Sequence, residues 1–498
     1  MFNKPLPPPM NDQQSRRNFL FRTGQGFGGL ALAYLLNQDG LLAAGGCEND
    51  PNVISPFSPK KPHFKPRAKN VISLFMCGGV SAIDTFDPKP ALDKYHGQPL
   101  PTDKDVQVQQ GFPGPIMRSP YKFKKYGQSG IEVSELFPHL GSKMDDIALI
   151  RSAVGRSNDH SISHYEWNTG AVLPGSPSYG SWITYGLGSE NQNLPAFVVI
   201  FDHRGGPYNG PNNWGAGYLP AAYQATAFRS SGDPILDLRP PAEYLTPADQ
   251  RARLDYLAWL NHQHEERFPG VSELSARIAS YELAYRMQSC APETVDIGQE
   301  SEATKNLYGL DSSVTQPFGR QCLLARRLVE RGVRFVQLWS GAYVNDTVDT
   351  WDAHNSIVDN HGQHAAEVDK PIAGLLTDLK QRGLLDETLV IWHTEFGRMP
   401  ISQRGVGRDH NPNAFSIWMS GAGIPGGQVI GQSDDFGYKV AEQPVSVFDF
   451  HASILHMVGI DHKRLTYLFN GRNMRLTDVH GELIPQITGM PAGSQGGA

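Results

Sequence analysis

The sequence predicts an α/β protein built on one large, mostly parallel sheet that helices cover on both faces. Two observations predict this fold class. Six short apolar runs alternate with helical stretches along the 498 residues, and strands that alternate with helices form crossover units and parallel sheets. Clusters rich in His, Asp and Glu also follow several of these runs, as expected of a site at the carboxyl ends of parallel strands.

The composition fits a loop-rich catalytic domain and excludes other classes. Lys and Arg total 44 and Asp and Glu total 50, which gives a formal charge of −6 and argues against a nucleic-acid partner held by charge. The 52 Gly and 37 Pro indicate many loops. The four cysteines have neither CxxC spacing nor the density of a disulfide-stapled domain. They are Cys47, Cys77, Cys290 and Cys322. The 17 histidines are therefore the better source of metal ligands.

Residues 1–46 are expected to form an export signal. Arg16 and Arg17 precede a short apolar run diluted by Gly and Ala, which resembles a twin-arginine signal. The run is shorter than the roughly 20 residues that span a membrane, so we expect no transmembrane span after processing. An N-terminal amphipathic helix is the alternative. We expect a periplasmic or extracellular protein that the twin-arginine machinery exports, with Cys47 as either a lipid-anchor site or a stray cysteine.

The remaining chain is expected to form one domain. Residues 47–68 are rich in Pro, Lys, Asn and Ser without an apolar period, so they are interpreted as a linker. The domain then covers 69–490, with a flexible tail at 491–498 and an inserted lobe, first rich in Gly and Pro and then helical, at about 204–304. Expected strands are 71–76, 148–150, 196–200, 333–338, 388–392 and 416–419, and expected helices are 247–286, 319–331, 364–383 and 447–458.

Two Asp and His pairs predict a metal site. Asp352 and His354 lie two residues apart after the strand expected at 333–338, and His361 or His364 could supplement them. Such mixed donors suit Zn²⁺, Mn²⁺ or Fe more than Ca²⁺. The alternative is helix capping by Asp352 with exposed histidines. The metal interpretation is favoured because a second pair, Asp409 and His410, precedes another strand at the same expected edge.

Other polar residues at strand ends suggest further roles. Glu395 and Arg398 follow the strand expected at 388–392, and the planar guanidinium of Arg398 suits a tetrahedral phosphate or sulfate oxyanion. An internal Glu395–Arg398 salt bridge is the alternative. The Gly78-Gly79 turn could offer backbone N–H groups to an anion, or it could be a structural turn. Asp84 is interpreted as a site residue.

These residues together resemble a known family, the proteins that contain domain of unknown function 1501. Its members are twin-arginine-exported relatives of the alkaline phosphatase and sulfatase superfamily. The matching stretches span nearly the whole chain after residue 69. They are 81–90, 177–194, 351–354, 369–389, 395–398, 407–410 and 475–481.

The resemblance implies an alkaline-phosphatase-like three-layer sandwich with two metal sites and a nucleophile between them. Asp352, His354 and His410 would form one site, with His361 as a rival ligand. The other site is eroded, because Glu395-Phe396 stands where the family has an Asp-His pair and Asp84 would replace the Asp that follows the first strand.

The resemblance does not extend to the sulfatase nucleophile. Sulfatases carry a Cys or Ser nine residues before a Thr-Gly, in a Cys-x-Pro-Ser-Arg pattern. Here the position nine residues before Thr169 is His160, and neither the Cys nor the Pro is present. A formylglycine mechanism is therefore not expected. Ser161 could be an activated nucleophile, His160 could attack or bind metal, or a metal-activated water could serve instead.

The sequence thus predicts an exported metal-dependent hydrolase of small-molecule or polysaccharide esters of sulfate or phosphate. The cofactor would be a divalent metal, with Zn or Mn ahead of Ca. The alternative is a catalytically degenerate relative that binds polysaccharide or another exported protein. The predicted metal ligands are Asp352, His354, His361, His410, Glu395 and Asp84, and the predicted catalytic residues are His160, Ser161 and Arg398.

Overall fold

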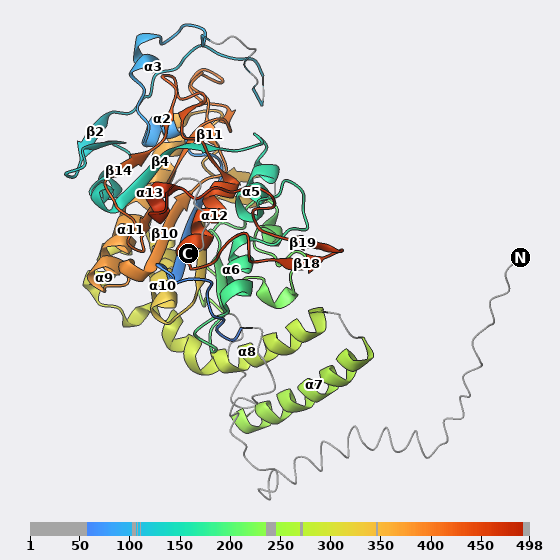
Figure 1. Cartoon of the computed structure of the whole chain (residues 1–498). Helices are drawn as coiled ribbons and strands as arrows, with labels where there is room; N and C mark the ends of the chain where they lie inside the picture. Colours follow the sequence, from blue (N-terminus) through green and yellow to red (C-terminus); the bar gives the residue numbers. More distant parts are fainter. Residues whose placement is uncertain are drawn as a thin grey trace, which may run out of the picture. The chain divides into compact units, whose positions relative to one another are not determined.

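The computed structural model describes residues 57–101, 106, 108–109, 111–235, 246–268, 272–344 and 347–491 (Figure 1). The expected export signal, Cys47 and nearly all of the expected tail lie outside the described residues. The described part of the expected linker runs along the domain. Lys60 N–H donates to the carbonyl oxygen of Leu187 over 2.8 Å, and Arg67 N–H donates to that of Met457 over 2.9 Å.

A nine-stranded, mostly parallel sheet forms the centre of the domain. β13 is the exception, because it runs antiparallel to both of its neighbours. All six strands expected from the sequence are present. Across the sheet the order is β14 (Gln428–Ile430), β4 (Ile147–Val154), β13 (Phe415–Gly421), β10 (Thr388–His393), β1 (Asn70–Met76), β7 (Phe335–Ser340), β5 (Phe197–Ile200) and β6 (Thr226–Phe228), with β17 (Val445–Ser446) beside β4.

Helices cover both faces of this sheet, which confirms the predicted fold class. Alternate residues of β1 enter two separate cores, because successive strand side chains point to opposite faces. Leu74 lies in the core shared with α10 (Gln316–Glu330) and α11 (Ile357–Gln381). Phe75 lies in the core shared with α5 (His160–Thr169), α6 (Tyr179–Leu187) and α12 (Val447–Met457).

Two of the expected helices have other bounds in the structure, and α5 and α6 are helices that the sequence does not predict. The stretch expected at 247–286 forms two helices, α7 (Pro247–Arg267) and α8 (Ser272–Val295), which an ion pair joins and which lie side by side in Figure 1. α11 begins at Ile357, before the expected start at 364, because the Ser356 side chain accepts from Asp359 N–H and caps it. His361 therefore lies on a helix. Within the expected lobe, β6 joins the central sheet as an edge strand.

Short elements complete the domain, and one of them positions the candidate site. β11 (Gly397–Arg398) pairs with β12 (His410–Asn411), which sets Arg398 opposite His410. The other short elements are β2 (Phe123–Tyr126), β3 (Ile131–Ser134), β8 (Ala342–Val344), β9 (Thr347–Asp349), β15 (Gln432–Ser433), β16 (Val440–Glu442), β18 (Tyr467–Phe469), β19 (Arg472–Met474), α2 (Ala82–Thr85), α3 (Pro90–Lys94), α4 (Pro138–Gly141), α9 (Glu302–Leu307) and α13 (Pro485–Thr488).

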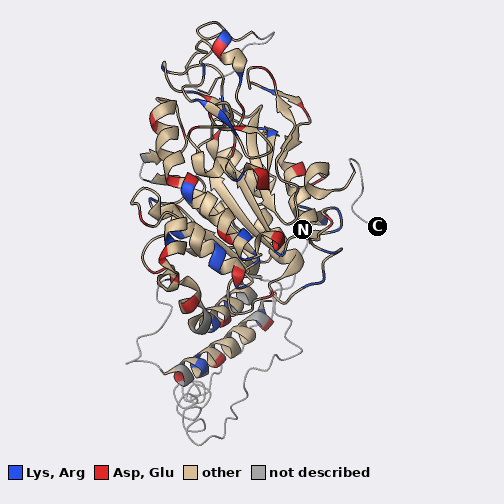
Figure 2. Ribbon diagram, turned by 90° about the vertical axis from the view of Figure 1, so that its left-hand side faces the viewer, with Lys and Arg blue, Asp and Glu red and all other residues tan. Residues whose placement is uncertain are grey.

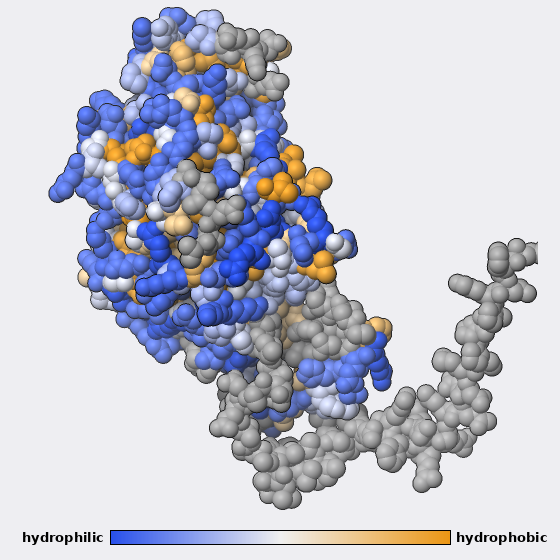
Figure 3. Space-filling model, in the orientation of Figure 1, coloured by the Kyte–Doolittle hydropathy of each residue, from blue (hydrophilic) through white to orange (hydrophobic). Residues whose placement is uncertain are grey.

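The surface carries both signs of charge. Figure 2 shows Lys, Arg, Asp and Glu scattered over helices and loops around tan central strands. The face in Figure 3 is dominated by hydrophilic residues, with apolar residues in small groups. Among the described helices, none combines the length and apolar character needed to cross a membrane.

Candidate metal centre

Histidines and carboxylates from distant parts of the chain meet at the carboxyl ends of the parallel strands. Glu395 follows β10, and Asp352 lies beyond β7. His160 and His164 lie in the first turns of α5, which follows β4. Asp409 and His410 lie at β12, which the β11–β12 pairing holds beside the residues after β10. Three overlapping groups of these side chains, together with His354, have ligand atoms close enough to hold a metal ion.

The Asp352 carboxylate is the centre of the first group. Its Oδ1 lies 3.0 Å from His354 Nε2 and 3.2 Å from His410 Nε2. Its Oδ2 lies 3.5 Å from His160 Nε2. All three imidazoles therefore turn the same nitrogen toward one carboxylate, which is the donor set expected for a transition metal.

The proton on His410 must lie on the far side of its ring. His410 Nδ1 is 2.6 Å from the carbonyl oxygen of Asn158, and a backbone carbonyl can only accept, so Nδ1 carries the proton. Burial lowers the pKa of His410 to about 4, which keeps the ring neutral at pH 7. Its Nε2 lone pair then faces the oxygen of Asp352, and two acceptors at this distance need a cation or proton between them.

His354 is oriented in the same way. Its Nδ1 contacts the side-chain oxygen of Gln403, which leaves Nε2 for the Asp352 carboxylate when Nδ1 is the donor. Metal-binding histidines commonly use one nitrogen for the ion and the other for such an oxygen acceptor. Asp409 lies behind this pair, with Oδ1 3.8 Å from His354 Nδ1 and 2.9 Å from His410 N–H.

Charge stabilises the ionised form of Asp352. Burial alone would raise the pKa of this carboxyl, but the charge of the Arg398 guanidinium and the three neighbouring histidines hold it far below its usual range. The Asp352 carboxylate therefore stays ionised at neutral pH. A negative charge next to the neutral imidazole of His410 is the electrostatic condition that favours a bound cation.

Glu395 forms a second group beneath the first. Its Oε1 accepts from Gly78 N–H over 2.8 Å and from His160 Nδ1 over 2.7 Å, and it lies 3.1 Å from His164 Nε2. In the described part of the chain neither ring nitrogen of His164 has a hydrogen-bond partner, although the side chain is fully buried. Burial would raise the pKa of Glu395, but its histidines hold it well below the usual value.

His160 connects the two groups. Burial alone would lower the pKa of this imidazole, but its hydrogen bonds to Asp352 and Glu395 outweigh that effect and raise it. In the absence of a cation the ring can therefore hold a proton between two carboxylates. The ring also packs against Phe396, with 4.9 Å between ring centroids.

Arg398 is fully buried, and the protein itself occupies its donors. Nε donates to the carbonyl oxygen of Gly79 over 2.8 Å, and Nη1 donates to that of Arg408 over 3.2 Å. Nη2 donates to Asp352 Oδ1 over 2.7 Å and also contacts the Gly78 carbonyl. Arg398 thus pairs with Asp352 rather than with Glu395. These contacts engage four of its five N–H donors, which leaves no pair of donors for the bidentate clamp on an ester oxyanion that the sequence suggested.

The predicted ligands Asp84 and His361 lie apart from these groups. Arg408 donates to both oxygens of Asp84, over 2.6 Å from Nε and 3.2 Å from Nη2. His361 Nε2 accepts from Ser81 N–H over 2.9 Å, and its Nδ1 lies 3.0 Å from Asn360 Oδ1. Both nitrogens of His361 are therefore engaged, and burial lowers its pKa well below the usual value.

Two further expected contributors, Gly78 and Ser161, each have a backbone polar group that forms a hydrogen bond within the protein. Gly78 N–H donates to Glu395, so it is not available to an anion. Positive φ angles of 114° and 80° at Gly78 and Gly79 explain why glycine is used in this turn. Ser161 is half-buried beside His160, where its carbonyl oxygen accepts from Asn209 Nδ2 over 2.6 Å.

A sequence comparison matches residues 68–488 to the family described as protein of unknown function (DUF1501). The match covers most of the chain. The chain belongs to the DUF1501 family. No curated protein gives a match to this DUF1501 chain.

Solved structures also resemble this DUF1501 domain at low identity. A sulfatase from Pseudoalteromonas sp. is 12% identical, with 80% of this chain and 68% of that one covered and a TM-score of 0.33. The alkaline phosphatase from the Antarctic bacterium TAB5 is 10% identical, with 75% and 96% covered and a TM-score of 0.33. A phosphonate monoester hydrolase from Silicibacter pomeroyi is 12% identical, with 85% and 77% covered and a TM-score of 0.32. At such values the DUF1501 site has to be understood from its own residues.

Sequence reasoning missed two members of the DUF1501 centre, His164 and Gln403. His164 follows His160 by four residues, and this spacing on a helix places both side chains on one face, so the pair could have been found. Asp409 belongs to the second Asp and His pair of the prediction, although it is not among the predicted ligands. Gln403 gives no local signal, because a glutamine in a loop contacts His354 only through the fold.

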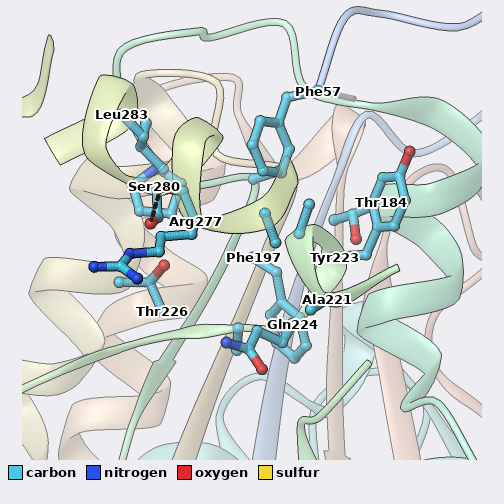
Figure 4. Close-up of a pocket in the computed structure, with 15 residues that line it drawn as sticks. Phe57, Thr184, Phe197, Ala221, Tyr223, Gln224, Thr226, Arg277, Ser280 and Leu283 are labelled. Carbon is cyan, nitrogen blue, oxygen red and sulfur yellow. Dashed lines mark hydrogen bonds between the residues drawn. The ribbon is translucent and has the colours of Figure 1, made fainter. Parts of the chain in front are cut away.

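The DUF1501 domain also has a hollow of about 420 Å³ away from this centre. Figure 4 shows Phe57, Tyr223 and Leu283 around it. Ala196 and Phe197 at the amino end of β5 line it, whereas the metal centre lies at the carboxyl ends of the strands. The hollow is therefore separate from the candidate centre.

Proposed function

We propose that the protein is an exported, metal-dependent hydrolase of sulfate or phosphate esters. The contact between His410 Nε2 and Asp352 Oδ1 carries this proposal. A neutral imidazole whose proton faces Asn158 presents its lone pair to an ionised carboxylate at 3.2 Å. A divalent cation satisfies both groups at once.

Asp352, His354 and His410 would hold the ion, with His160 beside them. The donor set fits Zn²⁺ or Mn²⁺ better than Ca²⁺, because two imidazoles and one carboxylate are softer than the all-oxygen sites that Ca²⁺ prefers. When bound, the ion would polarise the ester oxygen and lower the pKa of a nearby water. Arg398 orients the centre by fixing Asp352 Oδ1.

His160 is the best placed group to transfer a proton. Its Nδ1 is fixed by Glu395 at 2.7 Å, and its Nε2 faces the centre, 3.5 Å from Asp352 Oδ2. Glu395, held in its ionised form, favours the protonated ring. We therefore assign His160 as the general acid that protonates the leaving oxygen of the ester. Ser161, next to it at the amino end of α5, remains the alternative nucleophile to water.

Export by the twin-arginine route suits a metalloprotein, because that route carries folded chains. Arg16 and Arg17 would direct the chain to the periplasm or the cell exterior. Replacement of both by Lys should leave the protein in the cytoplasm, as cell fractionation would show.

One observation favours the second candidate, a catalytically degenerate binding protein. The backbone carbonyls of Gly79 and Arg408, together with Asp352, occupy the Arg398 guanidinium. An arginine clamp for an ester oxyanion is therefore missing from the described contacts. Such a protein would bind polysaccharide or another exported protein without turning it over.

Metal analysis combined with turnover assays tests the proposal. The purified processed protein should contain a divalent metal by mass spectrometry. It should hydrolyse at least one member of a panel of aryl sulfates, phosphomonoesters and phosphodiesters when supplied with Zn²⁺ or Mn²⁺. His354→Ala and His410→Ala should remove both properties.

His139→Ala is the matched control, because His139 is exposed on α4, away from the centre. It should retain metal and turnover. A protein that binds metal but hydrolyses nothing would support the binding-protein alternative, and a metal-free protein with unchanged turnover in His410→Ala would overturn the metal assignment.

A further inference from the structure

A groove lies next to α3 and β2, two elements that Figure 1 labels. Its volume is about 1020 Å³. Three chain segments line it: the stretch around α3, the approach to β2, and the start of α11 with the loop before β12. Buried Leu92 and Met117 are among its apolar lining residues, and exposed Val358 and Val406 are others.

The groove is richer in cations than the chain as a whole. Lys89, Arg118 and Lys122 line it together with His96, and Asp93 is the one acidic residue among its described lining residues. Arg118 and Lys122 are exposed, and neither has an ion pair within the described part of the chain. This local excess of positive charge contrasts with the formal charge of −6 for the whole chain.

One loop joins the groove to the metal centre. Gln403 and Gly407 pair across its base, and Gln403 contacts His354 Nδ1. Gly405 and Val406, on the same loop, line the groove. Ile357 N–H donates to the Val406 carbonyl over 3.0 Å, which fixes the loop against the start of α11. A single short loop therefore presents one side to the centre and the other to the groove.

We propose that this groove binds an anionic glycan chain whose ester group is presented to the metal centre. This inference rests on the proposed function and names its substrate as a polymer rather than a small ester. Arg118 and Lys122 pair with the charged substituents of neighbouring sugar units, whereas Lys89 is held by Asp87 at 3.1 Å. Val358 and Val406 contact the apolar faces of the rings.

The lining favours a glycan over other anions. A glycan chain alternates rigid apolar ring faces with charged substituents, which matches walls that alternate Val and Pro with Lys and Arg. A nucleic acid would need a longer run of cations than the two exposed ones of this groove. A bilayer surface is flat and cannot enter a concave groove.

Binding of a sulfated probe tests the proposal. Fluorescently labelled dextran sulfate oligosaccharide is titrated with metal-free processed protein, and neutral dextran of the same length serves as the uncharged probe. Arg118→Ala/Lys122→Ala should bind dextran sulfate about tenfold more weakly than wild type, because two exposed charge contacts are lost. Added salt should weaken wild-type binding more steeply than binding by this variant.

Lys124→Ala/Lys125→Ala is the matched control, because it removes two exposed cations of β2 that do not line the groove. It should keep the wild-type affinity. Equal affinity in the groove variant, or equal binding of neutral dextran, would overturn the proposal. Tighter binding of duplex DNA or phosphatidylserine vesicles that is lost in the same variant would overturn it as well, because the occupant would then be of another class.

The outcome can be separated from that of the proposed function. Glycan binding is measured without metal, so it should be unchanged in His354→Ala even if no ester is ever hydrolysed. If turnover is found, the groove variant should raise KM for a polymeric sulfate ester and leave KM for a small aryl ester unchanged. A rise in both values would place the two cations in the centre rather than in a groove.

Discussion

Asp84 and Asp352 are carboxylates that accept from an arginine near the carboxyl ends of the sheet, the first fully buried and the second largely buried, with its side chain 15% exposed. Around Asp84 the donors match the acceptors, because Arg408 contacts both oxygens and the Ser81 hydroxyl also donates. Around Asp352 the match fails. Arg398 Nη2 donates to Oδ1, and three imidazoles also direct their Nε2 atoms at this carboxylate. The His410 proton lies on Nδ1, so its Nε2 has no proton to donate.

The difference shows that burial and residue type do not separate a structural carboxylate from a metal ligand. What separates them is whether hydrogen bonds within the protein satisfy every lone pair. Asp84 forms a closed pair, whereas Asp352 and its histidines leave room for a cation. Substitutions at four sites test this difference.

The largest effect is expected at the closed pair. Asp84→Asn leaves the fully buried Arg408 without a counter-charge, so the free energy of unfolding should fall by about 3–5 kcal/mol. Urea titration measures it. The double variant Asp84→Leu/Arg408→Met should be less destabilised than the single one, because it leaves no unpaired charge. Metal content per folded molecule should not change, and loss of metal in the single variant would contradict the contrast.

Substitution of Asp352 should have the opposite effect, in which metal affinity is lost and the fold is kept. Asp352→Asn removes the charge that all three histidines face, so affinity for Zn²⁺ should fall by at least about a hundredfold. Competition with a chromogenic chelator measures this affinity. Arg398 keeps its carbonyl partners at Gly79 and Arg408, so we expect the metal-free variant to stay folded. Retention of wild-type affinity would remove Asp352 from the site.

His451 extends the contrast to a histidine outside the centre. It lies fully buried with Nε2 3.2 Å from the Trp167 carbonyl, and burial lowers its pKa to about 3. Below pH 6.5 the His451 imidazole is protonated in the unfolded chain, whereas in the folded chain it stays neutral until about pH 3. The free energy of unfolding should therefore fall as the pH is lowered through this window. His451→Gln should flatten that fall by about 1.4 kcal/mol per pH unit, as urea titrations between pH 4 and 6 would show.

The smallest effect is expected at Gln403, which touches the centre only through His354. Gln403→Met removes the acceptor for His354 Nδ1, so Zn²⁺ affinity should fall by about tenfold. Gln403→Glu keeps an oxygen acceptor and should retain the affinity. If both variants bind Zn²⁺ equally, the Gln403 contact does not orient His354.

Much of the fold could be predicted from local sequence. Apolar runs such as that of β1 are continuous because both faces of a parallel sheet are buried, and this pattern is visible in any single run. The prediction starts this helix at 364, seven residues after α11 begins, because it does not recognise the Ser356 cap. The pairing of β6 with β5 could not be read either, because so short an edge strand has no periodic signal.

Part of the candidate site could likewise be predicted from local sequence, and part could not. Asp352, His354 and His410 were found because each pair of ligand-type residues is close in sequence and follows a strand. His361 was named by the same reasoning, yet both of its nitrogens are engaged elsewhere, with Ser81 and Asn360. The sequence shows which side chains can bind a metal, but it does not show which of them form hydrogen bonds to other residues in the folded protein.

The sequence alone determined the layered fold, the order of strands and helices, and the enrichment of His and Asp at the strand ends. These properties follow from local periodicity and from residue chemistry, which neighbours along the chain reveal. The folded structure was needed to show that Arg398 pairs with Asp352, that Arg408 pairs with Asp84, and that His164 contacts Glu395. Each of these is a match of donors to acceptors between residues far apart in sequence, and such matches exist only once the chain is folded.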